Sequence, residues 1–200
     1  MKVLIVGRTK MAGSSRCIGG LLADGTSVRL MKPGGQWDTT SEFDVGDVWN
    51  LNFQNLASLS PPHTEDILVT DFDYVKEQTD LQSHLLERLS PWEGGIDEVF
   101  EGKLGFTGNN NGFISKARGV PNYSTWFWIP NADLTLRNDG KHYDYPQWFG
   151  RKGMSYVGEP APIPIIPAGT LVRLSLARWW KPDDAEDLEE RCYLQLSGWF

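Results

Sequence analysis

The feature that most constrains the fold of this chain is an alternation of apolar and polar residues near its C-terminal end. Residues 169–180 (GTLVRLSLARWW) and residues 191–200 (RCYLQLSGWF) both alternate with a period of two. That period is typical of β-strands that bury one face, and it places Arg173 and Ser175 opposite Leu174. Arg and Trp stand beside each other in the first segment, so the pattern predicts a β-barrel that presents cations and aromatic rings.

The composition favours a mainly β protein. The chain has 200 residues, which is enough for one large domain or two small domains with cores of their own. Its 21 Gly and 12 Pro favour many short strands and turns. Four leucines between residues 79 and 90 stand at helical spacing and are followed by Pro91, which predicts one short α-helix there.

Two domains are expected, over residues 1–100 and 101–200. A Gly- and Asn-rich stretch at residues 105–112 marks the change of character near this boundary. Residues 25–31 (GTSVRLM) also resemble residues 169–175 (GTLVRLS), an echo that two related barrels would explain. A glycine turn before an alternating strand is common in β proteins, so chance is the alternative explanation.

The charge is uneven along the chain. A formal net charge of −7 argues against a protein that coats duplex nucleic acid. Residues 1–32 carry +5 and residues 101–181 carry +5, whereas residues 33–100 carry −12 and residues 182–200 carry −5. If the two basic blocks pack side by side, they form one positive face. The alternative is that the acidic segments are solvated and that nothing binds the basic strands.

Two segments supply candidate binding residues. Residues 7–16 hold three cations among small residues, which lets backbone N–H groups approach an anion or, alternatively, forms an ordinary hairpin. Residues 173–180 pair Arg with Trp, as in proteins that stack single-stranded bases on aromatic rings. Burial in the core is the alternative for most Trp side chains. The predicted nucleic-acid-binding residues are Arg8, Lys10, Arg16, Arg29, Trp126, Trp128, Arg173, Arg178 and Trp179, with Tyr123 and Trp148 as further candidate rings.

Signals for catalysis are weak. Residues 61–66 group His63 with Glu65 and Asp66, which are residue types used in acid–base catalysis and metal binding, but a structured turn explains them equally. The phosphate-binding motifs G-x-x-x-x-G-K-[S/T] and G-x-G-x-x-G are absent from the sequence. Cys17 and Cys192 lie in strand-like segments and are expected to be reduced thiols. We therefore expect no enzyme, no cofactor and no metal site.

Membrane segments are not expected. The apolar run before Gly7 is too short for a signal peptide or a membrane span, and no run of about 18 apolar residues follows. We expect a soluble, cytoplasmic protein that makes no membrane contact.

Six segments carry a resemblance to a known family, the bacterial dual OB-containing domain. They are residues 2–10 (KVLIVGRTK), 16–20 (RCIGG), 45–48 (VGDV), 61–66 (PPHTED), 176–180 (LARWW) and 191–199 (RCYLQLSGW). The resemblance implies two small OB-like β-barrels packed together. It also implies nucleic-acid or nucleotide sensing as an accessory component of a prokaryotic defence system. It implies no catalytic residue.

Three functions are open at this point. The leading hypothesis is a non-enzymatic module that holds single-stranded nucleic acid or a nucleotide in a groove formed by residues 7–16 and 173–180. The alternative is an adaptor whose acidic surface docks onto a larger effector protein. The third hypothesis is an enzyme that uses His63, Glu65 and Asp66.

Overall fold

The computed structural model describes residues 1–183 and 187–200, which form two compact units. The first unit holds residues 1–60 and 64–90 together with Phe200. The second holds residues 61–63 and the described residues of 91–199. Strands dominate both units, and α1 (Leu81–Leu86) is the single α-helix of the described chain. The expectation of a mainly β protein with one short α-helix is confirmed.

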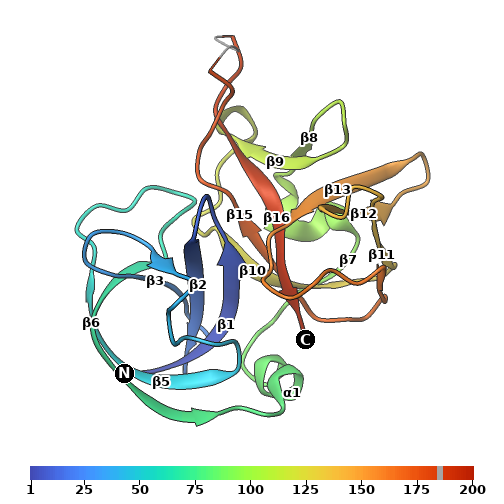
Figure 1. Ribbon diagram of the computed structural model, residues 1–200. Coiled ribbons are helices and arrows are strands. Elements are labelled where there is room, and N and C mark those ends of the chain that lie inside the picture. Colours follow the sequence, from blue (N-terminus) through green and yellow to red (C-terminus); the bar gives the residue numbers. More distant parts are fainter. Residues whose placement is uncertain (184–186) are drawn as a thin grey trace. The chain divides into compact units, whose positions relative to one another are not determined.

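The first unit is a closed five-stranded barrel (Figure 1). Its strands are β1 (Lys2–Lys10), β2 (Ser15–Leu22), β3 (Ser27–Met31), β5 (Asp47–Asn55) and β6 (Asp66–Glu77), and the short β4 (Trp37–Asp38) pairs with β2. The order around the barrel is β1-β2-β3-β6-β5, and β5 pairs back to β1. Only β3 and β6 run parallel among the five pairings, so the chain must cross the barrel end between them.

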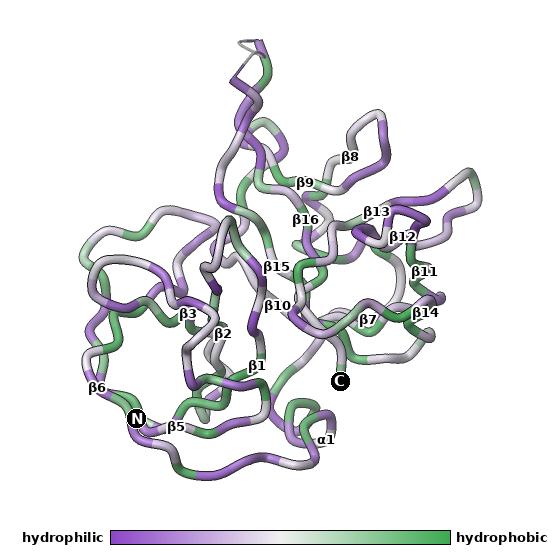
Figure 2. Tube along the Cα trace, viewed as in Figure 1, coloured by the Kyte–Doolittle hydropathy of each residue, from purple (hydrophilic) through white to green (hydrophobic). Residues whose placement is uncertain are grey.

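Alternating side chains explain why these segments close around one core. Figure 2 shows β1 passing from apolar residues at its start to hydrophilic residues towards Lys10. A Cβ at Gly20 would lie 2.4 Å from Val3 Cγ1, so a glycine lets β1 and β2 approach closely. Each fully buried aliphatic side chain contributes roughly 1.5–3 kcal/mol to folding. The buried core residues are Val3, Ile5, Ile18, Val28, Leu30, Phe43, Trp49, Leu51, Ile67 and Val69.

The second unit contains a larger sheet. Its strands are β7 (Trp92–Gly94), β8 (Gly105–Phe106), β9 (Gly112–Ser115), β10 (Thr125–Pro130), β11 (Leu134–Leu136), β12 (His142–Pro146), β13 (Arg151–Tyr156), β14 (Ile165–Ile166), β15 (Val172–Leu176) and β16 (Arg191–Trp199). Two 3-10 helical segments, η1 (Ile96–Gly102) and η2 (Lys116–Arg118), connect them. The main path of the sheet is β14-β11-β12-β13-β16-β15-β10-β7.

The second sheet repeats the strand order of the first barrel. β12, β13, β16 and β15 follow one another as β2, β3, β6 and β5 do, and β13 runs parallel to β16 as β3 runs parallel to β6. β10 pairs with β15, and β11 pairs with β12. These two short strands therefore occupy together the position of β1, with a break at residues 131–133. The apolar residues that alternate along β15 lie in the core of this unit: Val172, Leu174 and Leu176.

No helix among the described residues is long and apolar enough to cross a membrane.

Candidate functional site

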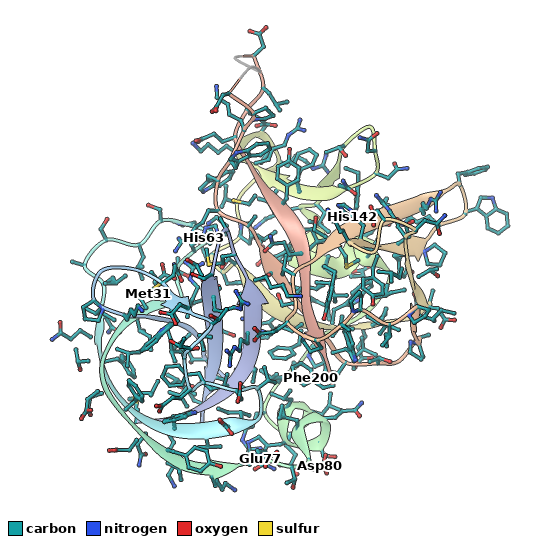
Figure 3. The ribbon with its side chains drawn as sticks, viewed as in Figure 1. Met31, His63, Glu77, Asp80, His142 and Phe200 are labelled. Carbon is teal, nitrogen blue, oxygen red and sulfur yellow. The ribbon has the colours of Figure 1, made fainter. Side chains whose placement is uncertain are left out.

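The outer face of the β12–β13 hairpin carries a polar hollow of about 930 Å³. Tyr143 and Tyr145 belong to the core, so strand alternation turns His142 and Asp144 to the outer face. The turn that follows β11 and the loop between β8 and β9 line the hollow as well. Figure 3 labels His142 within this part of the second unit. The hollow is thus built from three segments around one sheet face.

Asp144 is the charged centre of the hollow, and its side chain is 8% exposed. Arg137 donates from Nε to Asp144 Oδ1 at 2.7 Å, and its Nη2 lies 2.7 Å from the same oxygen in an ion pair. Arg151 donates from Nη1 to Asp144 Oδ2 at 3.1 Å. One carboxylate therefore orients two guanidinium groups. The Arg151 side chain is 68% exposed, so its other N–H groups face solvent and can bind an anion.

An asparagine-rich turn forms one wall of the hollow. Asn110 N donates to Thr107 O at 2.8 Å, and Thr107 N donates to Asn111 O at 3.0 Å. Asn110 has φ 62°, a left-handed conformation that Asn adopts more readily than most residues. Gly153 N donates to Asn110 O at 2.7 Å, which fixes the turn to β13. The turn brings amide donors and acceptors beside the two guanidinium groups.

Asp139 orients the imidazole of His142 at the opposite wall. Asp139 Oδ2 lies 2.7 Å from His142 Nδ1, and Asp139 Oδ1 accepts from Lys141 N at 2.8 Å. The backbone hydrogen bond from Lys141, followed by the His142 contact, lowers the pKa of Asp139 below its ordinary value. The ionised carboxylate accepts a hydrogen bond from Nδ1–H, so His142 Nε2 is the ring nitrogen left for another partner.

The tip of the β12–β13 hairpin presents two exposed aromatic side chains. Trp148 is 92% exposed and Phe149 is 91% exposed, and their ring centroids lie 6.5 Å apart at an interplanar angle of 75°. Gln147 N donates to Gly150 O at 3.0 Å, and Gly150 has φ 89°, so the two rings stand at the turn itself. The hairpin projects beyond the sheet in Figure 1. Adjacent apolar rings in water are typical of a binding surface.

The base of this hairpin is held to η1. Asp97 accepts from Lys152 Nζ at 2.5 Å and from Gln147 Nε2 at 2.9 Å. The hydrogen bond from Lys152 is the main reason that the pKa of Asp97 lies below its ordinary value. Lys152 Nζ also lies 4.3 Å from the ring centroid of Phe106. The exposed rings therefore extend from an anchored base.

The sequence matches a domain family over residues 1–199, and the description of that family is "Dual OB-containing domain". The chain belongs to this family. The repeated strand order fits the description, because an OB fold is a five-stranded barrel, and it indicates a binding module of a generally non-catalytic fold. Comparisons with curated proteins and with solved structures gave no match.

The hollow occupies the ligand-binding position of an OB fold. OB folds bind ligands on the face of their second and third strands and with the loops that join strands 1 to 2 and strands 4 to 5. In the second unit of this dual OB-containing domain, β12 and β13 correspond by strand order to the second and third strands. Residues 137–141 form the 1–2 turn, and residues 177–190 join strands 4 and 5.

The predicted Arg–Trp segment begins this 4–5 connection. Arg178 is exposed and Trp180 is 54% exposed. Trp179 is partly buried, and its Nε1 donates to Pro61 O at 3.2 Å. Lys116 Nζ lies 5.5 Å from the ring centroid of Trp179. Arg178 and Trp180 therefore offer the accessible cation and ring of this segment, while Trp179 also has a structural role.

The 1–2 hairpin of the first barrel carries two of the predicted cations. Lys10 and Arg16 are cross-strand partners at the open end of β1 and β2. Like charges directly opposite each other are unfavourable, so this pair concentrates positive potential at the hairpin. Arg16 Nη1 donates to Ser15 O at 3.0 Å, and Arg8 Nη1 donates to Asp44 Oδ1 at 2.5 Å. Arg8 thus clamps the loop that contains Asp44, whereas Lys10 is exposed.

Three predicted binding residues are buried and need correction. Arg29 forms an ion pair with Asp66, and both residues are buried. Trp128 has no exposed surface, and Arg173, on β15 between β10 and β16, is 5% exposed. A ligand cannot reach these side chains without unfolding the strands around them. Trp126 is half-buried, with its ring centroid 6.3 Å from that of Trp92.

The residues of the enzyme hypothesis have structural partners. His63 is 2% exposed, and its Nε2 lies 3.2 Å from the carbonyl oxygen of Leu176, so Nε2 is the donor. Asp66 holds the Arg29 guanidinium, and Glu65 O accepts from Arg29 N at 2.7 Å. No group of three His, Cys, Asp or Glu side chains in residues 1–183 and 187–200 is placed to hold a metal ion. All three residues are buried.

The sequence predictions missed Arg137, Arg151 and Phe149. The available signal was the QWF segment between Pro146 and Gly150, where two aromatic residues occupy a turn between strand-like runs. The roles of Arg137 and Arg151 depend on strand register, which brings residue 151 opposite residue 146.

Proposed function

We propose that this dual OB-containing domain binds single-stranded nucleic acid on the outer face of β12 and β13. The observation that carries the proposal is that the β12–β13 hairpin joins the exposed Trp148–Phe149 tip to Asp144 and Arg151, which form a charged centre with Arg137 of the preceding turn. Guanidinium groups bind phosphates with paired hydrogen bonds, and aromatic rings stack on unpaired bases. A protein that binds a single strand has to contact both its phosphates and its unpaired bases.

The preference for a single strand follows from the hairpin tip. The rings of Trp148 and Phe149 can stack only on bases whose faces are open, and duplex bases are already stacked. The amides of Asn109 and Asn110 and the imidazole of His142 provide hydrogen-bonding groups for base edges. A net charge of −7 disfavours general attraction to duplex DNA, so binding depends on this local arrangement.

Further contacts come from the other OB loops. Arg178 and Trp180 extend the surface of the second barrel, and Lys10 with Arg16 offers a separate cationic hairpin on the first barrel. A mononucleotide is the smaller ligand that the same hollow of about 930 Å³ would hold. We infer a non-enzymatic role. A function as an accessory component of a prokaryotic defence system stays a prediction from the family resemblance.

Fluorescence anisotropy with labelled single-stranded DNA, single-stranded RNA and duplex DNA tests the proposal. Titrations at about 50 and 200 mM salt should show salt-dependent binding to a single strand and weaker binding to the duplex. Trp148→Ala/Phe149→Ala should lower single-strand affinity while the fold stays intact. Tyr74→Ala is the matched control, because it removes a ring that is 55% exposed in the first barrel. Equal affinity for all variants, or no binding, would overturn the proposal.

An adaptor role is the second candidate, favoured by the charge of −12 in residues 33–100. The exposed Asp71 and Asp73 of β6 contribute to this acidic surface. A larger effector with a basic face is the expected partner. Cross-linking in the native host should then recover one partner through residues 33–100, and absence of a stable partner would count against this role.

A further inference from the structure

A second hollow, of about 170 Å³, lies in the first barrel beside α1. Its apolar wall comes from the starts of β1 and β5 and from the end of β2, with Leu4, Leu21, Leu22 and Val48 as the main contributors. It is separate from the nucleic-acid proposal, because all of its lining residues belong to the first unit. The wall favours an aliphatic body over a nucleobase with many polar edges.

The rim of this hollow is basic. Lys2, Lys76, His84 and Arg88 line it, and no Asp or Glu does so in the described chain. Hydrogen bonds within the protein hold two of these side chains in place, those of Arg88 and Lys76. Arg88 Nη1 donates to His84 O at 2.9 Å, and Lys76 Nζ donates to Gln78 Oε1 at 3.4 Å. An apolar wall beside the cations Lys2, Lys76 and Arg88 is complementary to a small amphipathic anion.

The sequence around α1 explains how the basic rim forms. Asp80 caps the helix by accepting from Ser83 N at 3.2 Å, and Leu85 is fully buried against the barrel. His84 belongs to α1, and Arg88 follows the C-cap residue Glu87 in a turn in which Arg88 N donates to Leu85 O at 3.0 Å. Figure 3 labels Glu77 at the end of β6 and Asp80 beside α1. Glu87 does not line the hollow, but its Oε2 lies 3.1 Å from Arg88 Nη1.

The lowered pKa of His84 agrees with a positive potential at this site. Desolvation lowers the pKa of His84, and the charges of Arg88 and Lys76 lower it further against the opposing effects of Glu87 and Asp80. The imidazole is therefore neutral at pH 7 and can donate one hydrogen bond. Local positive potential of this kind is relieved by a bound anion.

We propose that the hollow between α1 and the first barrel binds a free, small carboxylic acid with a branched aliphatic body. The carboxylate meets Arg88 and Lys76 at the rim, and the aliphatic body contacts Leu4, Leu21 and Val48. A volume of about 170 Å³ equals roughly five or six water molecules at about 30 Å³ each. That space suits an acid of about eight non-hydrogen atoms and excludes a long fatty chain.

The test uses 4-methylpentanoate as the probe and two matched ligands. A titration of the isotope-labelled full chain, followed by amide chemical shifts, should show saturable changes around residues 21–23 and 84–88. The expected dissociation constant is on the order of 1 mM for a ligand of this size. The alcohol 4-methylpentan-1-ol has the same body without the charge, and acetate has the charge without the body. Each should bind at least about tenfold more weakly.

Two variants locate the site. Arg88→Gln should weaken probe binding about tenfold or more, because a charge-assisted hydrogen bond is lost. Ala23→Leu should abolish binding by filling the hollow from an exposed lining position. Arg118→Gln is the control, since Arg118 also donates from an exposed side chain to a backbone carbonyl, Lys103 O, at 3.3 Å. It should bind the probe as the unaltered chain does.

The outcomes separate clearly. Saturable shifts that depend on the charge, the body and Arg88 support the proposal. Equal binding of the alcohol, shifts elsewhere, or no saturation in a chain whose amide spectrum shows it folded would overturn it. Failure here leaves the nucleic-acid proposal unaffected, because that proposal is tested with oligonucleotides and variants of the second barrel.

Discussion

The guanidinium of Arg137 occupies the space in which a side chain at Gly153 would begin. A Cβ on Gly153 would lie 2.1 Å from Arg137 Nη2, 3.0 Å from Arg137 Cζ and 3.1 Å from Asp144 Oδ1. The glycine therefore lets Arg137 lie flat over β13 while it donates to Asp144. Arg137 cannot move away from a new methyl group without leaving a carboxylate that is 8% exposed.

We predict that Gly153→Ala destabilises the protein by about 1–3 kcal/mol and weakens single-strand binding, because Asp144 loses its best partner. Urea unfolding and anisotropy titration measure the two effects. Gly198→Ala is the matched control: it lies in β16 with no atom within 4 Å of the added Cβ. The control should change stability by less than about 1 kcal/mol. Equal effects of both substitutions would contradict this account of Gly153.

Arg29 and Asp66 should behave as a buried ion pair, not as a ligand site. They are cross-strand partners on β3 and β6, and they are 9% and 6% exposed. Asp66→Asn should cost about 3–5 kcal/mol because it leaves a buried guanidinium without its opposing charge. Arg29→Met/Asp66→Leu should recover much of that loss. Urea unfolding of the single and double variants gives the coupling energy. A loss below about 1 kcal/mol in Asp66→Asn would show that the pair is not electrostatically buried.

Strand alternation predicted the core face of β15 but not the burial of its second face. The period-two pattern of β15 put Val172, Leu174 and Leu176 on one face, and these residues do form the core. It also put Arg173 on the opposite face, which is covered as well: Ser175 Oγ there contacts Ser197 Oγ at 2.6 Å. A single strand's pattern does not reveal which neighbours cover its outer face.

The position of the candidate site depended on topology in the same way. The echo between residues 25–31 and 169–175 matched β3 with β15, which hold different places in the two strand orders. The equivalent of β3 is β13, whose sequence RKGMSY shares no such pattern. The hollow forms because the β12–β13 register and the turn at residues 137–141 bring Arg137 and Arg151 to one carboxylate. Such long-range pairing has no local sequence signal.

Cys192 should resist thiol reagents and should make folding stability sensitive to alkaline pH. It is fully buried, and burial raises the pKa of its thiol from 9.0 to about 12. The folded state thus keeps the proton that the unfolded chain loses near pH 9. This contribution to stability is complete below pH 9 and is lost as the pH rises towards 12, by at most about 1.4 kcal/mol per pH unit.

Unfolding free energies between pH 8 and pH 10 measure this effect. The unaltered chain should lose stability more steeply than Cys192→Ala over that interval, because the two proteins share their tyrosines and differ only in this thiol. Iodoacetamide at pH 8 should modify the partly exposed Cys17 in the folded protein and should reach Cys192 only in denaturant. Parallel stability curves for the two proteins, or rapid native modification of Cys192, would contradict the prediction.

The proposed binding face should separate into an electrostatic part and a stacking part. Arg151→Gln removes one exposed cation, so the slope of log K against log salt for single-stranded DNA should become shallower by about 0.7. Trp148→Ala removes an uncharged ring, so it should lower affinity by about 1–3 kcal/mol while the slope stays unchanged. Anisotropy titrations at four or more salt concentrations give both quantities for each variant. Because the Trp148 ring is almost fully exposed, its removal should leave the urea midpoint unaltered. A change of slope in Trp148→Ala, or an unchanged slope in Arg151→Gln, would mean that phosphates and bases do not lie along this hairpin as the geometry requires.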